Sequence, residues 1–152
     1  MENHSLHWWF LKNTCGMALI ASMVLAAILG CKTLLVIPVW WAQAVVLIGG
    51  ITSLFHYYCL KRVLSNIQQP RTLVSEGGLF CRIRHPMYTG DFVMYTGFWL
   101  MASSVYTVPV LLLAYLAIWR QAHVEDRYIE RRFPTEFKLW STRSGLLFPK
   151  LF

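Results

Sequence analysis

Two short polar segments in an otherwise apolar chain hold the residue types that could do chemistry. The first is residues 84–90, Arg-His-Pro-Met-Tyr-Thr-Gly. Pro86 suits the first turn of a helix, because the proline nitrogen has no hydrogen to donate there. The free N–H groups at such a helix start form a positive pole, and Arg84 and His85 stand directly before it. We therefore expect this junction to hold a carboxylate or a similar anion.

The second polar segment contains His123, Glu125 and Asp126, shortly after an apolar run that ends at Trp119. Paired carboxylates beside aromatic rings suit a cation, either an ammonium or a sulfonium. Taken singly, each segment could be a solvated surface or a contact with lipid headgroups. If the fold brings the two segments to the same side, their combination indicates a ligand site.

The elements that position these segments follow from the composition. Hydrophobic residues make up 57% of the 152 residues and charged residues 14%, against roughly 45–50% and 25% in soluble proteins. Residues 14–31, 33–60 and 92–119 contain no Asp, Glu, Lys or Arg. Each run reaches the roughly 18–20 residues that cross a bilayer core. We keep the first run as a span rather than a signal peptide, because the chain stays apolar beyond it.

The basic residues give the orientation of the predicted spans. The net charge is +7, and 13 of the 14 Lys and Arg residues precede the first run, follow the second, or follow the third. Excess Lys and Arg marks cytoplasmic segments. We therefore expect an integral, multi-pass membrane protein with both termini and the candidate site on the cytoplasmic face. The positive charge then reflects topology and needs no nucleic-acid partner.

The third apolar run could be one tilted span or a hairpin of two shorter helices. Basic residues flank both of its ends, so both ends should lie on the same side, which requires the hairpin. The polar cluster able to form its tip is Ser103, Ser104, Tyr106, Thr107 and Pro109. The prediction is four spans, at about residues 13–31, 39–60, 88–103 and 107–123.

The fold class that results is an all-α integral membrane protein with one domain, residues 1–152. Its four transmembrane helices include a final hairpin, and an amphipathic cytoplasmic tail follows, in which charges alternate with aromatic residues. The spacing of the tail fits a short amphipathic helix at the membrane surface that ends near residues 143–145. Between the second and third spans, residues 68–71 should stop a helix and residues 76–78 should turn the chain. The four cysteines are far apart and lack the spacing of a metal site, so we expect no metal.

A family resemblance rests on a longer string of residues in the second half of the chain. Gly78, Arg84-His85-Pro86-x-Tyr88-x-Gly90, a hydrophobic hairpin, an acidic pair, and then Phe133-x-x-Glu136-Phe137-x-x-Trp140-x-x-Arg143-x-Gly145-Leu146-x-Phe148-Pro149 follow in that order. This string resembles the isoprenylcysteine carboxyl methyltransferase family over about residues 76–150. The stretch from Pro86 to Gly97 also resembles the phosphatidylethanolamine N-methyltransferases. The acidic pair is typically two glutamates in the family, and here it is Glu125-Asp126, which leaves the role of Asp126 less defined.

The resemblance implies S-adenosylmethionine as the cofactor, bound without a Rossmann fold; the sequence has no G-x-G-x-x-G after a strand. It implies that the cofactor's polar end is lined by Arg84, His85, Pro86, Tyr88 and Gly90. Its ammonium or ribose would be held by Glu125 and Asp126. Glu136 and Arg143 would order the tail that covers the site.

The methyl acceptor is expected to be lipid-like and embedded in the membrane. A carboxylate acceptor, as in a prenylated cysteine, needs no general base, and Arg143 or Arg120 could orient it. An amine acceptor, as in phosphatidylethanolamine, must lose a proton, which Glu125 or His123 could accept. We take carboxyl methylation as the first hypothesis, with Arg143 and Glu125 as catalytic residues, and phospholipid N-methylation as the alternative.

Two further classes compete with a methyltransferase. Membrane reductases that bind a nicotinamide cofactor have a similar carboxy-terminal half, but they are much longer chains. A small non-enzymatic membrane scaffold would need no ligand site and no shared face for the two polar segments. Binding of S-adenosylmethionine would separate these classes.

Overall fold

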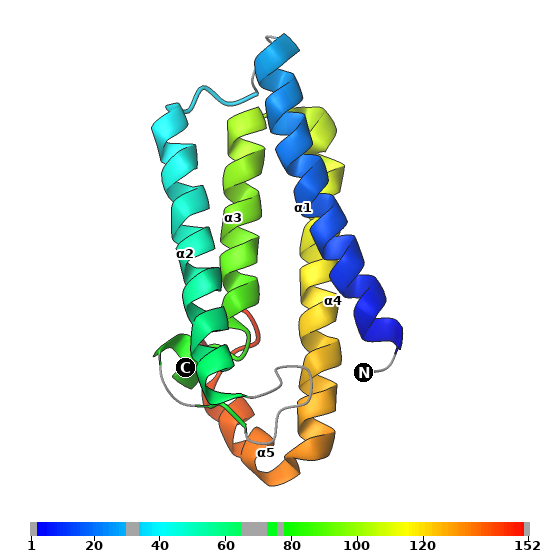
Figure 1. Cartoon of the computed structure of the whole chain (residues 1–152), viewed down its shortest axis with the longest axis vertical. Helices are drawn as coiled ribbons and strands as arrows, with labels where there is room; N and C mark the ends of the chain where they lie inside the picture. Colours follow the sequence, from blue (N-terminus) through cyan, green and yellow to red (C-terminus); the bar gives the residue numbers. More distant parts are fainter. Residues whose placement is uncertain (1–2, 30–33, 65–72, 76–77, 151–152) are drawn as a thin grey trace.

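The residues that the structure describes form a bundle of four long helices with a short fifth helix at one end (Figure 1). The computed structural model describes residues 3–29, 34–64, 73–75 and 78–150. Within these residues the structure is helical without a named strand, and an isolated parallel bridge joins Ile83 to Gly145. The helices are α1 (Asn3–Leu29), α2 (Val39–Val63), α3 (Pro86–Ala102), α4 (Val108–Arg132) and α5 (Pro134–Arg143), with the 3-10 turns η1 (Gly78–Cys81) and η2 (Val105–Thr107).

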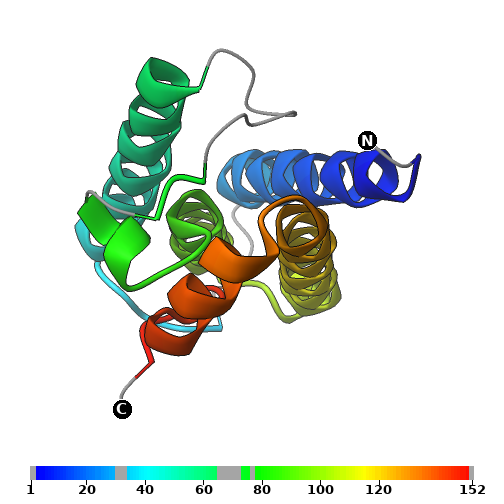
Figure 2. The same cartoon turned by 90° about the horizontal axis from the view of Figure 1, so that it is seen from below.

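The arrangement gathers the polar segments at one end of the bundle. Helices α2 and α3 lie side by side, and α1 leans across α4 (Figure 1). Seen from below, α5 extends from the end of α4 across the foot of α3 (Figure 2). The start of α3, the end of α4 and both chain ends therefore lie at this end, which we call the polar end. The basic residues that close α2 and α4 are there too: Lys61, Arg62, Arg131 and Arg132.

Three helical segments are long and apolar enough to cross a membrane within the described residues, namely Leu6–Leu29, Val39–Val63 and Val105–Arg132. Large apolar side chains such as Ile28 and Leu54 are exposed, as expected for helices that face lipid. Helix α3 has 17 residues, which is about 26 Å and short of a 30 Å bilayer core. The membrane-protein class is thus supported, whereas the fourth span and the cytoplasmic side of the tail stay predictions.

The hairpin forms where the sequence predicts it. Ser103 ends α3 in the left-handed conformation with φ of 43°, and its N–H donates to the carbonyl of Trp99 at 2.6 Å. The η2 turn follows, and Pro109 lies in the first turn of α4. The long apolar run is therefore two helices whose outer ends both reach the polar end of the bundle.

Helix α1 begins at Asn3, ten residues before the predicted start near Asn13. The predicted span starts after Lys12, because the uncharged run that defines it begins at residue 14. In the structure Lys12 is buried and its Nζ lies 2.5 Å from Oδ2 of Asp91 on α3, so the helix continues through it. Helix α2 runs three residues past its predicted end, to Val63, and α4 runs nine residues past its predicted end, to Arg132.

Helices α2 and α3 are joined by close backbone contact at glycines. A Cβ atom added to Gly49 would lie 2.4 Å from the Met94 nitrogen, and one added to Gly90 would lie 2.6 Å from the Gly49 oxygen. Gly97 repeats the pattern higher up, where an added Cβ would lie 2.7 Å from the Val46 nitrogen. Small residues permit this approach between membrane helices. We call this contact the glycine seam.

The tail forms a helix, as its spacing predicts, and α5 ends at Arg143. Its apolar face packs on the protein itself: Phe137 and Trp140 are buried with Phe80 of η1, and the Trp140 Nε1 donates to the Phe80 carbonyl at 2.7 Å. The sequence suggests that this face rests on the membrane surface, and the structure shows that part of it is covered by η1.

Two predicted features of the connections lie outside the described residues. These are the helix stop at residues 68–71 and most of the turn at residues 76–78, of which Gly78 is described. Gly78 has φ of +54°, a conformation that glycine adopts readily, and it opens η1.

Candidate functional site

The site is built around the start of α3, where the tail runs beside the chain. The N–H groups of Arg84 and His85 donate to the carbonyls of Gly145 and Leu146 at 2.8 and 3.1 Å. These two amides, which the sequence suggests as part of an anion site, are thus bound to the tail. Pro86 opens α3 as predicted. The tail thereby fixes the backbone from which the Arg84 and His85 side chains project.

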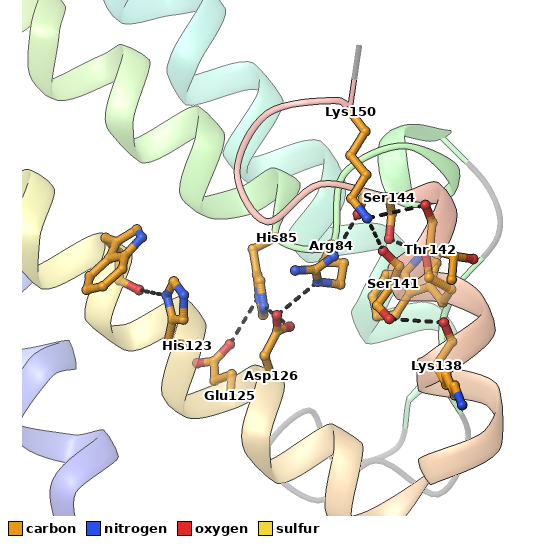
Figure 3. Close-up of polar contacts among 12 residues, drawn as sticks. Arg84, His85, His123, Glu125, Asp126, Lys138, Ser141, Thr142, Ser144 and Lys150 are labelled. Carbon is orange, nitrogen blue, oxygen red and sulfur yellow. Dashed lines mark hydrogen bonds and ion pairs between the residues drawn. The ribbon is translucent and has the colours of Figure 1, made fainter. Parts of the chain in front are cut away.

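Both side chains converge on the acidic pair of α4 (Figure 3). Arg84 Nε donates to Asp126 Oδ2 at 2.9 Å, and His85 Nε2 lies 2.8 Å from Asp126 Oδ1. His85 Nδ1 lies 3.6 Å from Glu125 Oε2. Arg84 also donates from Nη1 to the Ser144 carbonyl at 2.7 Å. The two polar segments that the sequence singles out therefore meet, as the hairpin predicts.

Glu125 has a different environment from Asp126. Its Oε1 accepts a hydrogen bond from the Tyr88 hydroxyl at 2.5 Å and one from Gln121 Nε2 at 2.7 Å, both from neutral groups. The Glu125 side chain is 36% exposed, against 12% for Asp126. Asp126 is thus paired with a guanidinium, whereas Glu125 accepts its hydrogen bonds from neutral groups and lies at a more accessible position.

A third carboxylate, Asp91, lies on α3 about one turn after Tyr88 and is paired with Lys12 of α1. The Ser53 hydroxyl of α2 donates to its other oxygen, Oδ1, at 2.8 Å. Tyr88 connects this pair with the acidic pair, because the Lys12 Nζ lies 4.9 Å from the centre of the Tyr88 ring. We call the connected group the polar cluster: Lys12, Arg84, His85, Tyr88, Asp91, Gln121, Glu125 and Asp126.

An open hollow of about 440 Å³ adjoins the polar cluster between α4 and α5. Its size falls within the roughly 300–1,000 Å³ range of small-molecule sites. Its lining combines three arginines with two carboxylates, two large aromatic rings and two smaller polar side chains: Arg84, Arg120, Arg127, Asp126, Glu130, Trp119, Phe137, His123 and Ser141. Since the arginines outnumber the carboxylates, the hollow favours an anionic group.

His123 and Arg120 stand at the edge of the hollow on α4. The His123 ring packs against Trp119 at 4.2 Å, and its Nδ1 lies 2.9 Å from the Trp119 carbonyl (Figure 3). The Arg120 guanidinium lies over the rings of Trp8 and Trp119 at 5.8 and 5.6 Å. Aromatic contacts of this kind hold a cation without neutralising it, so Arg120 remains able to attract an anion.

Two of the predicted site residues lie apart from the side chains of the cluster. Gly90 faces α2 in the glycine seam, close to the Gly49 oxygen and the Ser53 nitrogen. Arg143 is the last residue of α5 and is exposed, while the carbonyl of the next residue, Ser144, reaches Arg84. Glu136 lies in the first turn of α5.

Four residues of the site are not singled out by the sequence: Gln121, Lys12, Asp91 and Ser144. Gln121 lies four residues before Glu125 on α4, a spacing that places two side chains on one helix face and could have identified it. Lys12 reads as a topology signal, and Asp91 beside the third apolar run carries no sign of which basic residue pairs with it. Ser144 contributes a backbone carbonyl, which any residue would supply, so no sequence signal exists for it.

A metal site does not emerge from this geometry: no group of three or more His, Cys, Asp or Glu side chains suited to a metal ion occurs among the residues that the structure describes. The acidic pair instead contacts a histidine, an arginine and a tyrosine, in a helical chain with three segments able to span a membrane. These features define a small membrane protein with an ionised site at one end of its helices.

The chain belongs to the phospholipid methyltransferase family, whose model matches residues 37–136. It is therefore a membrane methyltransferase. This family is related to the isoprenylcysteine carboxyl methyltransferases, so the resemblance noted in the sequence is confirmed. The match covers α2, α3 and the whole of α4, and thus the cluster residues from Arg84 to Asp126. Comparisons with curated proteins and with solved structures give no significant match.

Proposed function

We propose that the chain transfers a methyl group from S-adenosylmethionine to a lipid-like acceptor held in the membrane. The observation that carries this proposal is the difference in partners among the three clustered carboxylates. Asp91 is paired with a lysine and Asp126 with an arginine, while Glu125 receives hydrogen bonds from neutral Tyr88 and Gln121. An accessible carboxylate without a full cationic partner attracts a cationic ligand.

The chemistry of the polar cluster fits this cofactor. S-adenosylmethionine supplies an already activated methyl group on a positive sulfonium, and it also carries an ammonium and a carboxylate. Glu125, assisted by Asp126, would bind one of the positive groups, while Arg84 and His85 attract the carboxylate. The family resemblance also assigns Pro86 and Tyr88 to this place, and the hydrogen bond from Tyr88 to Glu125 supports the assignment for Tyr88. Gly90 allows α3 to pack closely on α2.

The protein's part in such a transfer is alignment and exclusion of water, because no proton needs to move from the methyl donor. The tail contributes by holding residues 84 and 85 through backbone hydrogen bonds. The side chains of Tyr88 and Gln121 fix the direction of the Glu125 carboxylate through two hydrogen bonds. The cluster would therefore hold the cofactor in one orientation beside the hollow.

The first candidate acceptor is a carboxylate on a prenylated cysteine or a similar lipid. The string from Phe133 to Pro149 supports it, and so does Arg120, which lines the hollow and could orient an anion there. We propose a catalytic role for Glu125 in holding the donor. For Arg143, which is exposed at the end of α5, we propose a role in attracting the acceptor carboxylate.

The second candidate acceptor is the amine of a phospholipid such as phosphatidylethanolamine. The family match favours it, because that model describes phospholipid methyltransferases. The headgroup phosphate would meet the arginines of the hollow, and His123 at its edge could accept the amine proton.

One labelling experiment tests both candidates. The protein in vesicles is given S-adenosylmethionine with a labelled methyl group, together with either a farnesylated cysteine analogue or phosphatidylethanolamine. A base-labile methyl ester would support the carboxylate, and a base-stable methylamine would support the phospholipid. Failure to bind the cofactor at all, measured by calorimetry on the wild type, would overturn the proposed function.

We also propose that residues 1–152 act as one domain with four spans and with both termini and the site in the cytoplasm. The gathering of basic residues at the polar end supports this orientation. Cysteines introduced at Arg84 and Arg131 should then be labelled from the cytoplasmic side alone. Labelling of the two positions from opposite sides would contradict the proposal.

A further inference from the structure

A buried ion pair joins α1 to α3 next to the proposed cofactor residues. Lys12 and Asp91 are 6% and 8% exposed, and the ion pair is 2.5 Å long. The Ser53 hydroxyl adds a hydrogen bond from α2. Three helices thus meet at two opposite charges.

Stability alone does not account for such a pair. Taking two charges out of water costs about as much as their attraction returns, and apolar replacements of buried pairs are often neutral or stabilising. Lys12 also lies within the span Leu6–Leu29, where a charge is especially costly. The ion pair is therefore expected to have a role beyond holding the helices together, and the residue that it contacts indicates this role.

The contact that matters is Tyr88. The Lys12 Nζ lies 4.9 Å from the centre of the Tyr88 ring, a cation–π distance, and the Tyr88 hydroxyl donates to Glu125. Asp91 fixes the position of the ammonium. A line of contacts therefore runs from Asp91 through Lys12 and Tyr88 to the carboxylate that we assign to the cofactor.

The position of α1 against α3 is set by the same region. The Tyr95 hydroxyl donates to the Lys12 carbonyl at 3.3 Å. One turn further along α1, a Cβ added to Gly16 would lie 2.6 Å from the Tyr95 hydroxyl oxygen. These contacts fix the Lys12 backbone at the level of Tyr88, and the ion pair with Asp91 holds the ammonium at the end of the side chain.

We propose that Lys12 is a positioning residue for the methyltransferase site, which acts through the Tyr88 ring to orient Glu125. The expected effect on S-adenosylmethionine binding rests on the proposed function. The positioning of Tyr88 can be observed without any cofactor. It makes α1, which lies outside the matched residues 37–136, a working part of the site.

The first experiment observes the Tyr88 ring in the protein without cofactor. The chain is labelled with 3-fluorotyrosine, and the Tyr88 resonance is assigned by its loss in Tyr88→Phe. The double variant Lys12→Met/Asp91→Asn removes both charges together, so no lone charge stays buried. We expect the Tyr88 resonance to shift and broaden in this variant. The control Lys61→Met removes an exposed lysine of α2 and should leave the resonance unchanged.

The second experiment follows the consequence for S-adenosylmethionine by calorimetry. The double variant should bind the cofactor about 3- to 10-fold more weakly, because the hydrogen bond from Tyr88 to Glu125 is weakened and not removed. Adding Lys12→Met/Asp91→Asn to Tyr88→Phe should cause little further loss, because both changes act on the same hydrogen bond to Glu125. A merely structural role would add its effect to that of Tyr88→Phe.

The outcomes separate this inference from the proposed function. An unchanged Tyr88 resonance in the double variant overturns the inference, whether or not the cofactor binds. Additive losses of affinity also overturn it. If the wild type binds no S-adenosylmethionine, the proposed function fails, and a shifted Tyr88 resonance would still establish that Lys12 positions the ring.

Discussion

The glycine seam and the polar cluster hold α3 in two different ways. In the seam, α3 meets α2 through backbone atoms. A Cβ atom added to Gly49 or Gly90 would lie less than 3 Å from backbone atoms of the facing helix. In the polar cluster, α3 meets α4 through charged side chains with ordinary hydrogen-bond lengths. The first contact depends on shape and the second on charge.

This difference between the two contacts predicts different effects of substitution, on the stability of the fold in the seam and on ligand binding in the polar cluster. A contact made of shape fails when an atom is added, since backbones cannot move apart without losing the packing around them. A contact made of charge accepts changes of shape at its exposed side, but it fails when a charge is removed. Substitutions in the seam should therefore unfold the bundle, and substitutions at Glu125 should weaken a ligand in an intact bundle.

The largest effect is expected from Gly49→Ala. The added Cβ would lie 2.4 Å from the Met94 nitrogen and 2.6 Å from the Gly90 oxygen, so α2 and α3 must separate. Overpacking against backbone should cost about 3 kcal/mol of unfolding free energy, the upper part of its usual range. Thermal unfolding in detergent, followed by circular dichroism, measures the loss.

The matched control is the next residue. A Cβ added to Gly50 would be 3.8 Å from the Met94 sulfur, an ordinary contact, and alanine favours a helix over glycine by about 1 kcal/mol. Gly50→Ala should therefore be neutral or stabilising. Equal losses in the two variants would show that the seam is not held by shape.

The second effect concerns Glu125→Gln, which removes the accessible charge and keeps the size of the side chain. Under the proposed function, S-adenosylmethionine should bind about 1–3 kcal/mol more weakly, the scale of one hydrogen bond to a charged group. The melting temperature should hardly change, because a glutamine oxygen can still accept from Tyr88 and Gln121. His85→Ala should weaken binding on a similar scale. Calorimetry gives the affinity.

Asp126→Asn provides the contrast within the same pair. Asparagine leaves the Arg84 guanidinium without its carboxylate at a site where both side chains are nearly buried, at 13% and 12% exposure. This variant should lose stability as well as affinity. If Glu125→Gln lowers the melting temperature as much as Asp126→Asn, the division between a structural and a binding carboxylate is wrong.

Much of the polar end could be predicted from the sequence, because its signals are local. Pro86 indicates the start of α3, the polar residues near Ser103 indicate the hairpin tip, and charges on both sides of the apolar run require its two ends to meet. Together these three features bring Arg84 and His85 to Glu125 and Asp126. The spacing of the tail likewise predicts where α5 ends.

The rest depends on contacts between distant parts of the chain. Lys12 reads as a topology signal until Asp91, which is 79 residues away, is seen beside it. The resemblance assigns Gly90 to the cofactor, whereas the structure places it against α2, and a glycine carries no side chain to show in advance which partner approaches it. The path of residues 145–147 beside residues 82–85 is made of backbone hydrogen bonds, which sequence patterns do not encode.

The smallest effect tests whether the tail belongs to the region held by polar contacts. The Thr89 hydroxyl of α3 donates to the Leu147 carbonyl at 2.5 Å and so ties the tail to the helix that carries Tyr88. Thr89→Val keeps the shape and removes this hydrogen bond, which should cost about 1 kcal/mol. The matched control is Thr52→Val, whose hydroxyl donates to the Ile48 carbonyl within α2 and joins no second element. Thermal unfolding and limited proteolysis after residue 143 measure the difference.

Because the tail also fixes the backbone of Arg84 and His85, Thr89→Val should weaken S-adenosylmethionine binding slightly, and Thr52→Val should leave it unchanged. Equal behaviour of the two variants would mean that the tail is held by the burial of Phe137 and Trp140 instead, and that the cluster is shaped by apolar packing as much as by its hydrogen bonds.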